Sequence, residues 1–159
     1  MKAQETVDYH IKSAWHAISR MYNAQAIKHD MTASIGYVLL NIDVEKGTAA
    51  TKIAPLLGLE TRSLTRMLKT MEENGMIYRE ADEKDKRGVK IKLTEEGKIK
   101  REVARKTVIA FNQHIKDHIP QGKLQVFFEV IEEISRLVEN KKYYQEAEMQ
   151  PYSPTLSTK

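Results

Sequence analysis

Residues 61–71 carry the clearest chemical pattern in the sequence, because apolar and polar side chains repeat there at the same helical spacing. The polar set begins two residues before the apolar set, and at about 100° per residue this offset places the two sets on opposite faces of a helix. Arginine, threonine and lysine side chains can contact base edges and phosphates in the major groove of DNA. The apolar set is Leu64, Met67, Leu68 and Met71, and the polar set is Arg62, Thr65, Arg66 and Lys69. Taken alone, this stripe also fits a helix that is charged only for solubility.

A second pattern follows at residues 82–97, DEKDKRGVKIKLTEEG, where charged residues precede Gly88 and lysines then alternate with apolar residues. Alternation with a period of two predicts a strand, and residues 76–80 show the same period. We therefore expect two antiparallel strands joined by a loop that turns at or near Gly88. The cations of this loop, Lys84, Lys86 and Arg87, can reach phosphates or a minor groove. A helix-turn-helix followed by such a hairpin is the winged-helix arrangement, and the joint pattern is much rarer by chance than either part.

Helices of different lengths are predicted before this hairpin. A heptad of apolar residues predicts a long amphipathic helix over residues 5–28, and its period suggests a helical partner. Thr32 is expected to cap a second helix that Gly47 ends, and a short helix through Ile53 closes at Gly58. Thr61 is expected to cap the next helix, which runs to residues 74–75. Pro55 fits the short helix only if that helix starts near residue 51 or 52, which would place the proline in the first turn.

After the hairpin, residues 94–97 begin a helix that extends to about Asp117, and Pro120 opens a last helix that carries apolar residues to Val138. The fold class predicted is mainly α with a small β-hairpin wing. We assign residues 31–94 to a winged helix-turn-helix DNA-binding lobe, and residues 1–30 and 95–149 to a helical dimerisation region. Residues 150–159 have two prolines and no periodicity, so a disordered tail is expected.

The composition limits the classes of function. The chain has 159 residues, 41% of them hydrophobic, and a formal net charge of +4, which suits one domain with a core and gives a weak hint of an anionic partner. It has no cysteine, which excludes disulfides and thiolate chemistry. No signal peptide and no apolar run of membrane-spanning length is seen, so we expect a cytoplasmic protein without membrane contact. Positive charge is concentrated between Lys84 and Lys106.

Enzymatic and metal chemistry find little support. The sequence has no phosphate-binding glycine loop, no zinc-protease motif and no cysteine nucleophile, so we expect neither an enzyme nor a cofactor. His114 and His118 are four residues apart, a spacing that lets two imidazoles face one metal ion. No third ligand is evident near them, so ordinary surface or interface histidines are favoured and no metal site is assigned.

The sequence resembles the MarR (multiple antibiotic resistance regulator) family of bacterial winged-helix transcription factors. The resemblance covers roughly residues 5–145 and is carried by the segments IAPLLGLETRSLTRMLKTMEENGMIYR, DEKDKR and KLTEEG. Asp82, Asp85 and Arg87 match the wing motif of the family, and Leu93, Thr94 and Gly97 match its strand-to-helix step. Lys84 stands where the family usually has arginine, and a lysine keeps the charge but lacks the planar fork.

The resemblance implies a homodimer whose first, fifth and sixth helices intertwine. Two copies of the helix over residues 61–74 would then enter successive major grooves of a pseudo-palindromic operator, about 34 Å apart. Asp85 would orient the cation of the wing by a charge-assisted hydrogen bond. The candidate DNA-binding residues are Thr61, Arg62, Ser63, Thr65, Arg66, Lys69, Lys84, Asp85, Lys86 and Arg87.

The resemblance also implies regulation by a small molecule. Members of the family commonly respond to aromatic, phenolic or lipidic ligands, and repression that the ligand releases is the usual outcome. Trp15, His16, Tyr37 and Phe111 are the candidate lining residues, with core or dimer packing as the plainer interpretation of Trp15 and Phe111. Two other classes of function stay open: a winged-helix module for protein–protein assembly, and an architectural protein that binds DNA without sequence choice.

Overall fold

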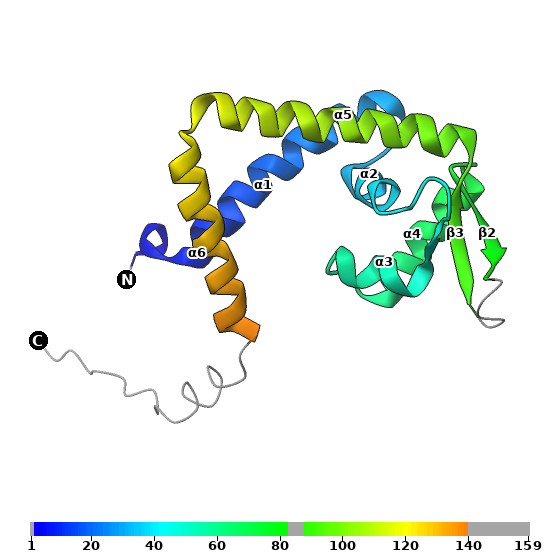
Figure 1. Cartoon of the computed structure of the whole chain (residues 1–159), viewed down its shortest axis with the longest axis horizontal. Helices are drawn as coiled ribbons and strands as arrows, with labels where there is room; N and C mark the ends of the chain where they lie inside the picture. Colours follow the sequence, from blue (N-terminus) through cyan, green and yellow to red (C-terminus); the bar gives the residue numbers. More distant parts are fainter. Residues whose placement is uncertain (1, 83–87, 140–159) are drawn as a thin grey trace, which may run out of the picture. The chain divides into compact units, whose positions relative to one another are not determined.

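The computed structural model of the chain describes residues 2–82 and 88–139 (Figure 1). Within this range the chain forms two compact units, one that extends to Phe111 and one that begins at Asn112. The expected hairpin tip at 83–87 and the expected disordered tail at 150–159 lie outside the described residues.

The first unit opens with a long helix and a short one. Helix α1 runs over Val7–Ala26 and is preceded by the 3₁₀ helix η1 (Ala3–Glu5) and followed by η2 (Ile27–His29). Asp30, in the left-handed region with φ 52°, ends this run. Helix α2 covers Ala33–Leu40 and is capped as predicted, because Thr32 Oγ1 accepts a hydrogen bond of 3.2 Å from the backbone N–H of Ile35.

The expected end of α2 at Gly47 is wrong, because the helix stops at Leu40. After the helix ends, the side chain of Asp43 bonds the backbone that follows it. Its Oδ1 accepts from the backbone N–H groups of Lys46 at 2.7 Å and Glu45 at 2.9 Å. These two bonds hold the pKa of the Asp43 carboxyl below its usual value. Gly47 instead closes this turn with φ 69°. An aspartate that bonds its own following backbone favours a turn over a helix.

Helices α3 (Ala50–Leu56) and α4 (Thr61–Glu73) form the predicted helix-turn-helix, with Gly58 at φ 60° in the turn. Pro55 is not in the first turn of α3, because the helix begins at Ala50 and the proline is its sixth residue. Because proline has no N–H, the carbonyl of Thr51 lacks its helical partner. The position is tolerated because α3 ends one residue later and both Thr51 and Pro55 are exposed, so water can bond that carbonyl. The cap of α4 is Glu60, and Thr61 is its first residue.

The sheet is larger than the predicted hairpin. Strands β2 (Ile77–Ala81) and β3 (Val89–Leu93) pair antiparallel as expected, with Arg79 opposite Ile91. A third strand, β1 (Thr48–Ala49), pairs antiparallel with β3 on its other side, which gives the order β1-β3-β2. Burial does not alternate along β2, where only Ile77 is buried. Strand β2 lies at one edge of this order, and most of its side chains face solvent.

The core of the first unit gathers the apolar faces of these elements. Its fully buried large side chains are Val38, Leu39, Ile42, Ile53, Met71, Ile77 and Ile91. Helix α5 (Glu95–His118) begins in this unit, and its Gly97 and Ala104 are buried. At Gly36 an added Cβ would meet the Ala104 Cβ at 3.4 Å, so α2 and α5 pack closely through small residues.

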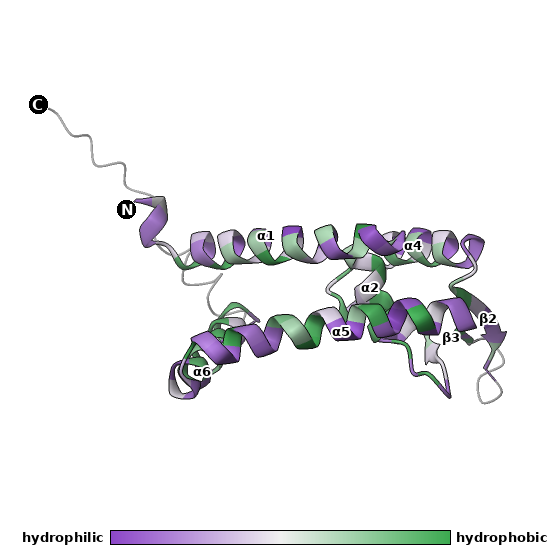
Figure 2. Ribbon diagram, turned by 90° about the horizontal axis from the view of Figure 1, so that it is seen from above, coloured by the Kyte–Doolittle hydropathy of each residue, from purple (hydrophilic) through white to green (hydrophobic). Residues whose placement is uncertain are grey.

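The second unit contains the end of α5 and helix α6 (Gln121–Glu139). Pro120 precedes α6 as predicted, and its carbonyl accepts from the backbone N–H groups of Lys123 and Leu124. Large apolar side chains of α6 are about half exposed, namely Val126, Phe127, Phe128, Val130, Leu137 and Val138. Figure 2 shows that hydrophobic and hydrophilic residues are interspersed along α6. Among the described residues, no helix is both long enough and apolar enough to span a bilayer.

Candidate nucleic-acid interface

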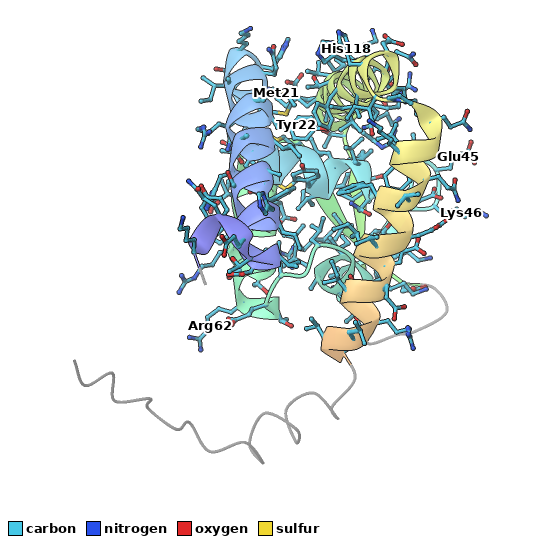
Figure 3. The ribbon with its side chains drawn as sticks, turned by 90° about the vertical axis from the view of Figure 1, so that its left-hand side faces the viewer. Met21, Tyr22, Glu45, Lys46, Arg62 and His118 are labelled. Atoms are coloured by element: carbon cyan, nitrogen blue, oxygen red, sulfur yellow. The ribbon has the colours of Figure 1, made fainter. Side chains whose placement is uncertain are left out.

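Helix α4 has the two faces that its sequence predicts. The relative exposure of Leu64 is 3%, that of Leu68 is 2% and that of Met71 is 0%, and Met67 packs partly buried against the same core. The whole polar set is exposed, including Arg62, whose side chain extends away from the ribbon in Figure 3. The exposed candidates on this helix are Thr61, Arg62, Ser63, Thr65, Arg66 and Lys69. The structure thus brings these six residues onto the open side of one helix.

The cations of α4 differ in how they are paired. Arg62 and Arg66 make no ion pair or hydrogen bond through their side chains with any residue that the structure describes. Lys69 Nζ lies 3.8 Å from Glu73 Oε1, and both side chains are well exposed. A surface pair of this kind contributes little. The two guanidinium groups are therefore available for an anion or a base edge.

The threonines of α4 are more constrained than the sequence suggests. Thr65 Oγ1 donates a hydrogen bond of 2.8 Å to the carbonyl oxygen of Thr61, four residues earlier. Thr70 Oγ1 makes the same kind of bond, 3.2 Å long, to the carbonyl of Arg66. A hydroxyl group has a single proton to donate. Thr65 can therefore offer a lone pair or its methyl group to a partner while this bond persists.

The end of α4 is fixed to the start of α5. Thr94 Oγ1 donates to the carbonyl of Gly75 at 2.6 Å and accepts from the backbone N–H of Gly97 at 3.0 Å, which makes Thr94 the cap of α5. The Thr94 N–H donates to the carbonyl of Met76 at 3.1 Å. A Cβ on Gly97 would overlap that same carbonyl oxygen. This contact explains why a threonine and a glycine are needed at these positions.

A second tie holds α4 to the sheet. Arg79 Nε, on β2, donates to Glu72 Oε2 on α4 at 3.0 Å. The pair is on the surface, so its contribution to stability is small. It does fix the side chain of Arg79 beside the polar half of α4.

The strands of the hairpin are held by cross-strand ion pairs. Lys92 Nζ lies 2.8 Å from Glu80 Oε2, and Lys90 Nζ lies 3.3 Å from Asp82 Oδ1. The backbone N–H of Asp82 also donates to the carbonyl of Gly88. The wing candidates Lys84, Asp85, Lys86 and Arg87 lie outside the described residues, so their contribution remains a prediction from the sequence.

Most of the described cations in the predicted basic stretch are paired with neighbouring carboxylates. Beyond the hairpin, Lys98 pairs with Glu95, Lys100 with Glu96 and Arg105 with Glu102. In the last pair the guanidinium holds the pKa of the Glu102 carboxyl below its usual value. Charge counted from the sequence therefore overstates the field of this surface, and the unpaired arginines of α4 matter more.

Three of the four predicted effector-site residues lie in one aromatic cluster. Trp15 stacks on Tyr37 with a centroid distance of 6.1 Å, and Tyr22 meets Tyr37 at 5.9 Å and Phe111 at 5.6 Å edge to face. Tyr22 joins the cluster but was not predicted, although it follows Trp15 by two turns of α1. His16 is exposed and makes no ring contact among the described residues. Burial raises the pKa of Tyr22 and of Tyr37.

The cavity beside these rings is small. Its volume is about 30 Å³, and it lies among Tyr22, Tyr37, Met31, Gly36 and Ala104. That volume accepts a water molecule, whereas ligand pockets usually reach several hundred Å³. An aromatic ligand at this place would therefore need the residues that line the cavity to move apart.

The histidine pair of α5 does not form a metal centre with its neighbours. The rings of His114 and His118 lie 4.2 Å apart between centroids, and His118 Nδ1 lies 2.8 Å from the carbonyl oxygen of His114. Within residues 2–82 and 88–139, no group of three potential ligands among His, Asp and Glu is arranged to hold a metal ion.

Known proteins match both the sequence and the fold of this chain. The sequence model of the MarR family matches residues 32–89, which hold α2 to the start of β3. The HTH-type transcriptional regulator TtmR of Methylorubrum extorquens is 34% identical over 88 residues, which cover 55% of this chain and 45% of TtmR. Residues 32–89 therefore belong to the MarR family. The match spans less than half the length of TtmR.

Solved structures of MarR-type regulators share the fold. The S. aureus MepR–DNA complex superposes with a TM-score of 0.76 and 19% identity over 82% of this chain and 97% of MepR. CouR from Rhodococcus jostii RHA1 bound to p-coumaroyl-CoA superposes with a TM-score of 0.72 and 19% sequence identity, over 84% of this chain and 94% of CouR. At this level of identity the likeness shows the mainly helical winged-helix fold, which confirms the predicted fold class.

Proposed function

We propose that this chain is a sequence-specific DNA-binding transcriptional regulator that acts as a homodimer on a pseudo-palindromic operator. The observation that carries the proposal is the outer face of α4, where Arg62 and Arg66 are exposed and unpaired among the described residues while Leu64 and Leu68 are buried opposite them. Guanidinium groups in this position can bond guanine O6 and N7 in a major groove. The MepR structure is that of a DNA complex, which supports the same use of the fold.

The hairpin would contribute contacts outside that groove. Its strands are tied by the Lys90–Asp82 and Lys92–Glu80 ion pairs, so the lysines of β3 are not the free cations of the wing. This leaves Lys84, Lys86 and Arg87 as the candidates for phosphate or minor-groove contact, with Asp85 to orient them.

Dimerisation would involve the long helices at both ends of the chain. Apolar side chains of α1 are about half exposed, including Val7, Ile11 and Trp15. Phe127, Phe128 and Val138 are exposed to a similar degree on α6. Side chains of this size rarely stay in water on several consecutive turns. We assign residues 1–30 and 95–149 to the dimerisation region and 31–94 to the DNA-binding lobe.

The chain would act as a repressor that a small aromatic or lipidic ligand releases. The aromatic cluster of Trp15, Tyr22, Tyr37 and Phe111 supports this proposal, because all its rings except Tyr22 are at least partly exposed. The cavity beside Tyr22 and Tyr37 also adjoins the tight α2–α5 contact at Gly36 and Ala104. CouR is described bound to p-coumaroyl-CoA. A ligand acts only if it favours one arrangement of the protein over another, and the small cavity implies that such a rearrangement accompanies binding.

Selection of bound duplexes from random DNA tests the DNA-binding proposal. We expect a pseudo-palindromic sequence that the chain binds roughly 10³-fold or more tightly than random duplex, with affinity that falls steeply as salt rises. A salt-dependent affinity without sequence preference would identify an architectural protein. Binding to neither duplex would favour a protein-assembly module, and both outcomes would overturn the proposal.

Tryptophan fluorescence tests the effector proposal, because Trp15 is the one tryptophan of the chain and stacks on Tyr37. Titration with candidate phenolic acids and acyl thioesters should change the emission of the protein and lower its affinity for the selected duplex over the same concentration range. Trp15→Phe keeps an aromatic ring and serves as the optical control. Fluorescence changes that leave DNA affinity unaltered would separate ligand binding from regulation and contradict the proposal.

A further inference from the structure

Among the candidate DNA-binding residues of α4, Thr65 is the one whose hydroxyl already donates a hydrogen bond within the helix. Its side chain is exposed, and its hydroxyl donates a 2.8 Å hydrogen bond to the Thr61 carbonyl within the same helix. The first-turn hydroxyls of α4, on Thr61 and Ser63, are exposed and make no side-chain hydrogen bond among the described residues. Thr65 therefore differs from its neighbours, because its only proton is already used.

A committed hydroxyl cannot read guanine in the major groove. Guanine presents the acceptors N7 and O6 there, so recognition of guanine needs a donor. The neighbouring unpaired side chains of Arg62 and Arg66 supply such donors in a planar fork. While the bond to Thr61 persists, the exposed side chain of Thr65 can offer a base edge only its methyl group or an oxygen lone pair.

We propose that Thr65 is a specificity-determining residue that reads the C5-methyl group of a thymine through its own methyl group. The inference rests on the proposed function, since it requires α4 to enter the major groove. Threonine methyl contact with the thymine methyl is chemically matched, because both groups are apolar and the major groove exposes the base methyl at its edge. Because Arg62 and Arg66 flank Thr65 in sequence, this thymine should lie next to a guanine in each half-site.

Deoxyuridine provides the decisive probe, because it pairs as thymine does and lacks only the C5-methyl group. In the duplex selected by the full-length protein, each thymine of a half-site is replaced in turn, and dissociation constants are measured by fluorescence anisotropy. We expect the unmodified protein to lose about fourfold in affinity at one thymine position per half-site, which is the effect of losing burial of one methyl group. If no replacement of thymine by deoxyuridine lowers the affinity, the inference is wrong.

Two substitutions at Thr65 separate the contribution of its methyl group to DNA binding from that of its hydroxyl group. Thr65→Val keeps the branched shape and a methyl and removes the hydroxyl, so it should bind the selected duplex within about twofold of the parent protein and keep the penalty for deoxyuridine. Thr65→Ser keeps the hydroxyl and removes the methyl, so it should bind thymine and deoxyuridine duplexes equally. Circular dichroism melting of both variants checks that α4 still folds.

The reverse result has a definite meaning. If Thr65→Val loses the preference and Thr65→Ser keeps it, the hydroxyl lone pair reads the amino group of adenine or cytosine, and the methyl proposal is wrong. Failure of the proposed function is recognised separately, because the parent protein would then show no preference for any selected duplex. In that case both proposals fall.

Discussion

At the scale of single residues, the pairing of each charge decides what the surface can bind. Arg62, Arg66 and Arg105 are all exposed, but Arg105 on α5 is held by Glu102. A paired cation must lose its partner before it can neutralise a phosphate, whereas an unpaired one gives up only water and counterions. The outer face of α4 is thus favoured over the N-terminal turns of α5 as the contact surface for DNA.

Arg66→Ala should relax base preference at one position per half-site and weaken binding to the selected duplex by about 1–3 kcal/mol, because a bidentate contact with guanine is lost. Lys69→Ala is the matched control on the same face. Loss of the Lys69 side chain should weaken binding to selected and random duplexes alike. It should also reduce the slope of log affinity against log salt by about the amount of one phosphate contact. Competition binding at several salt concentrations measures both effects. Equal losses on the two duplexes for Arg66→Ala would make Arg66 a phosphate contact.

At the scale of elements, the junction between α4, β2 and α5 sets the position of the recognition surface. The Met76 N–H bonds the carbonyl of Met71 at the end of α4, and the carbonyls of Gly75 and Met76 accept from Thr94 at the start of α5. Gly97 then faces the Met76 carbonyl without room for a side chain. Because no space separates these elements, a displacement of the first turn of α5 must carry the end of α4 with it.

Gly97→Ala should destabilise the protein by about 1–3 kcal/mol, since the new methyl group must push the Met76 carbonyl away from Thr94. Gly122→Ala on α6 is the control, because an added Cβ there meets nothing within 4 Å, and a small gain of at most about 1 kcal/mol is expected. Urea unfolding followed by circular dichroism compares the two variants. Equal stability of the two would show that the junction yields more easily than its geometry implies.

At the scale of the whole molecule, exposed apolar side chains on α1 and α6 indicate a surface that a partner covers. Each helix has apolar residues on consecutive turns, and the described residues of the chain leave them about half open to water. A second copy of the chain is the partner that the proposed function would require, because two recognition helices would have to reach two half-sites of one operator. Association and DNA binding are therefore coupled in this proposal.

Phe127→Glu should weaken self-association by at least about tenfold, because a carboxylate would have to be buried in an apolar interface. Gln125→Glu introduces the same charge two residues earlier, about 200° round the helix, and should leave association unaltered. Sedimentation velocity at micromolar protein concentration distinguishes the two. The affinity of Phe127→Glu for the selected duplex should fall with the loss of dimer, and unaltered sedimentation would remove α6 from the proposed interface.

The sequence by itself determined the order of the helices and of the two hairpin strands, and which face of α4 is buried. Local signals were sufficient here, because Thr32 caps the helix that follows it, Gly58 takes a positive φ and Pro120 begins the last helix. The separation of Leu64 and Leu68 from Arg62 and Arg66 follows from helical period alone. These features depend on residues within a few positions of each other, so a single sequence contains them.

Only the tertiary structure decided the features that depend on distant residues. The pairing of β1 with β3 joins residues 48–49 to residues 90–91, Tyr22 enters the aromatic cluster through contacts with Tyr37 and Phe111, and the lysines of β3 pair with carboxylates of the neighbouring strand and its loop. Local periodicity has no information on which partner a side chain meets across the fold. From the sequence alone the lysines of β3 count as free positive charge. In the folded chain they are paired, because strand pairing brings Glu80 and Asp82 within ion-pair distance.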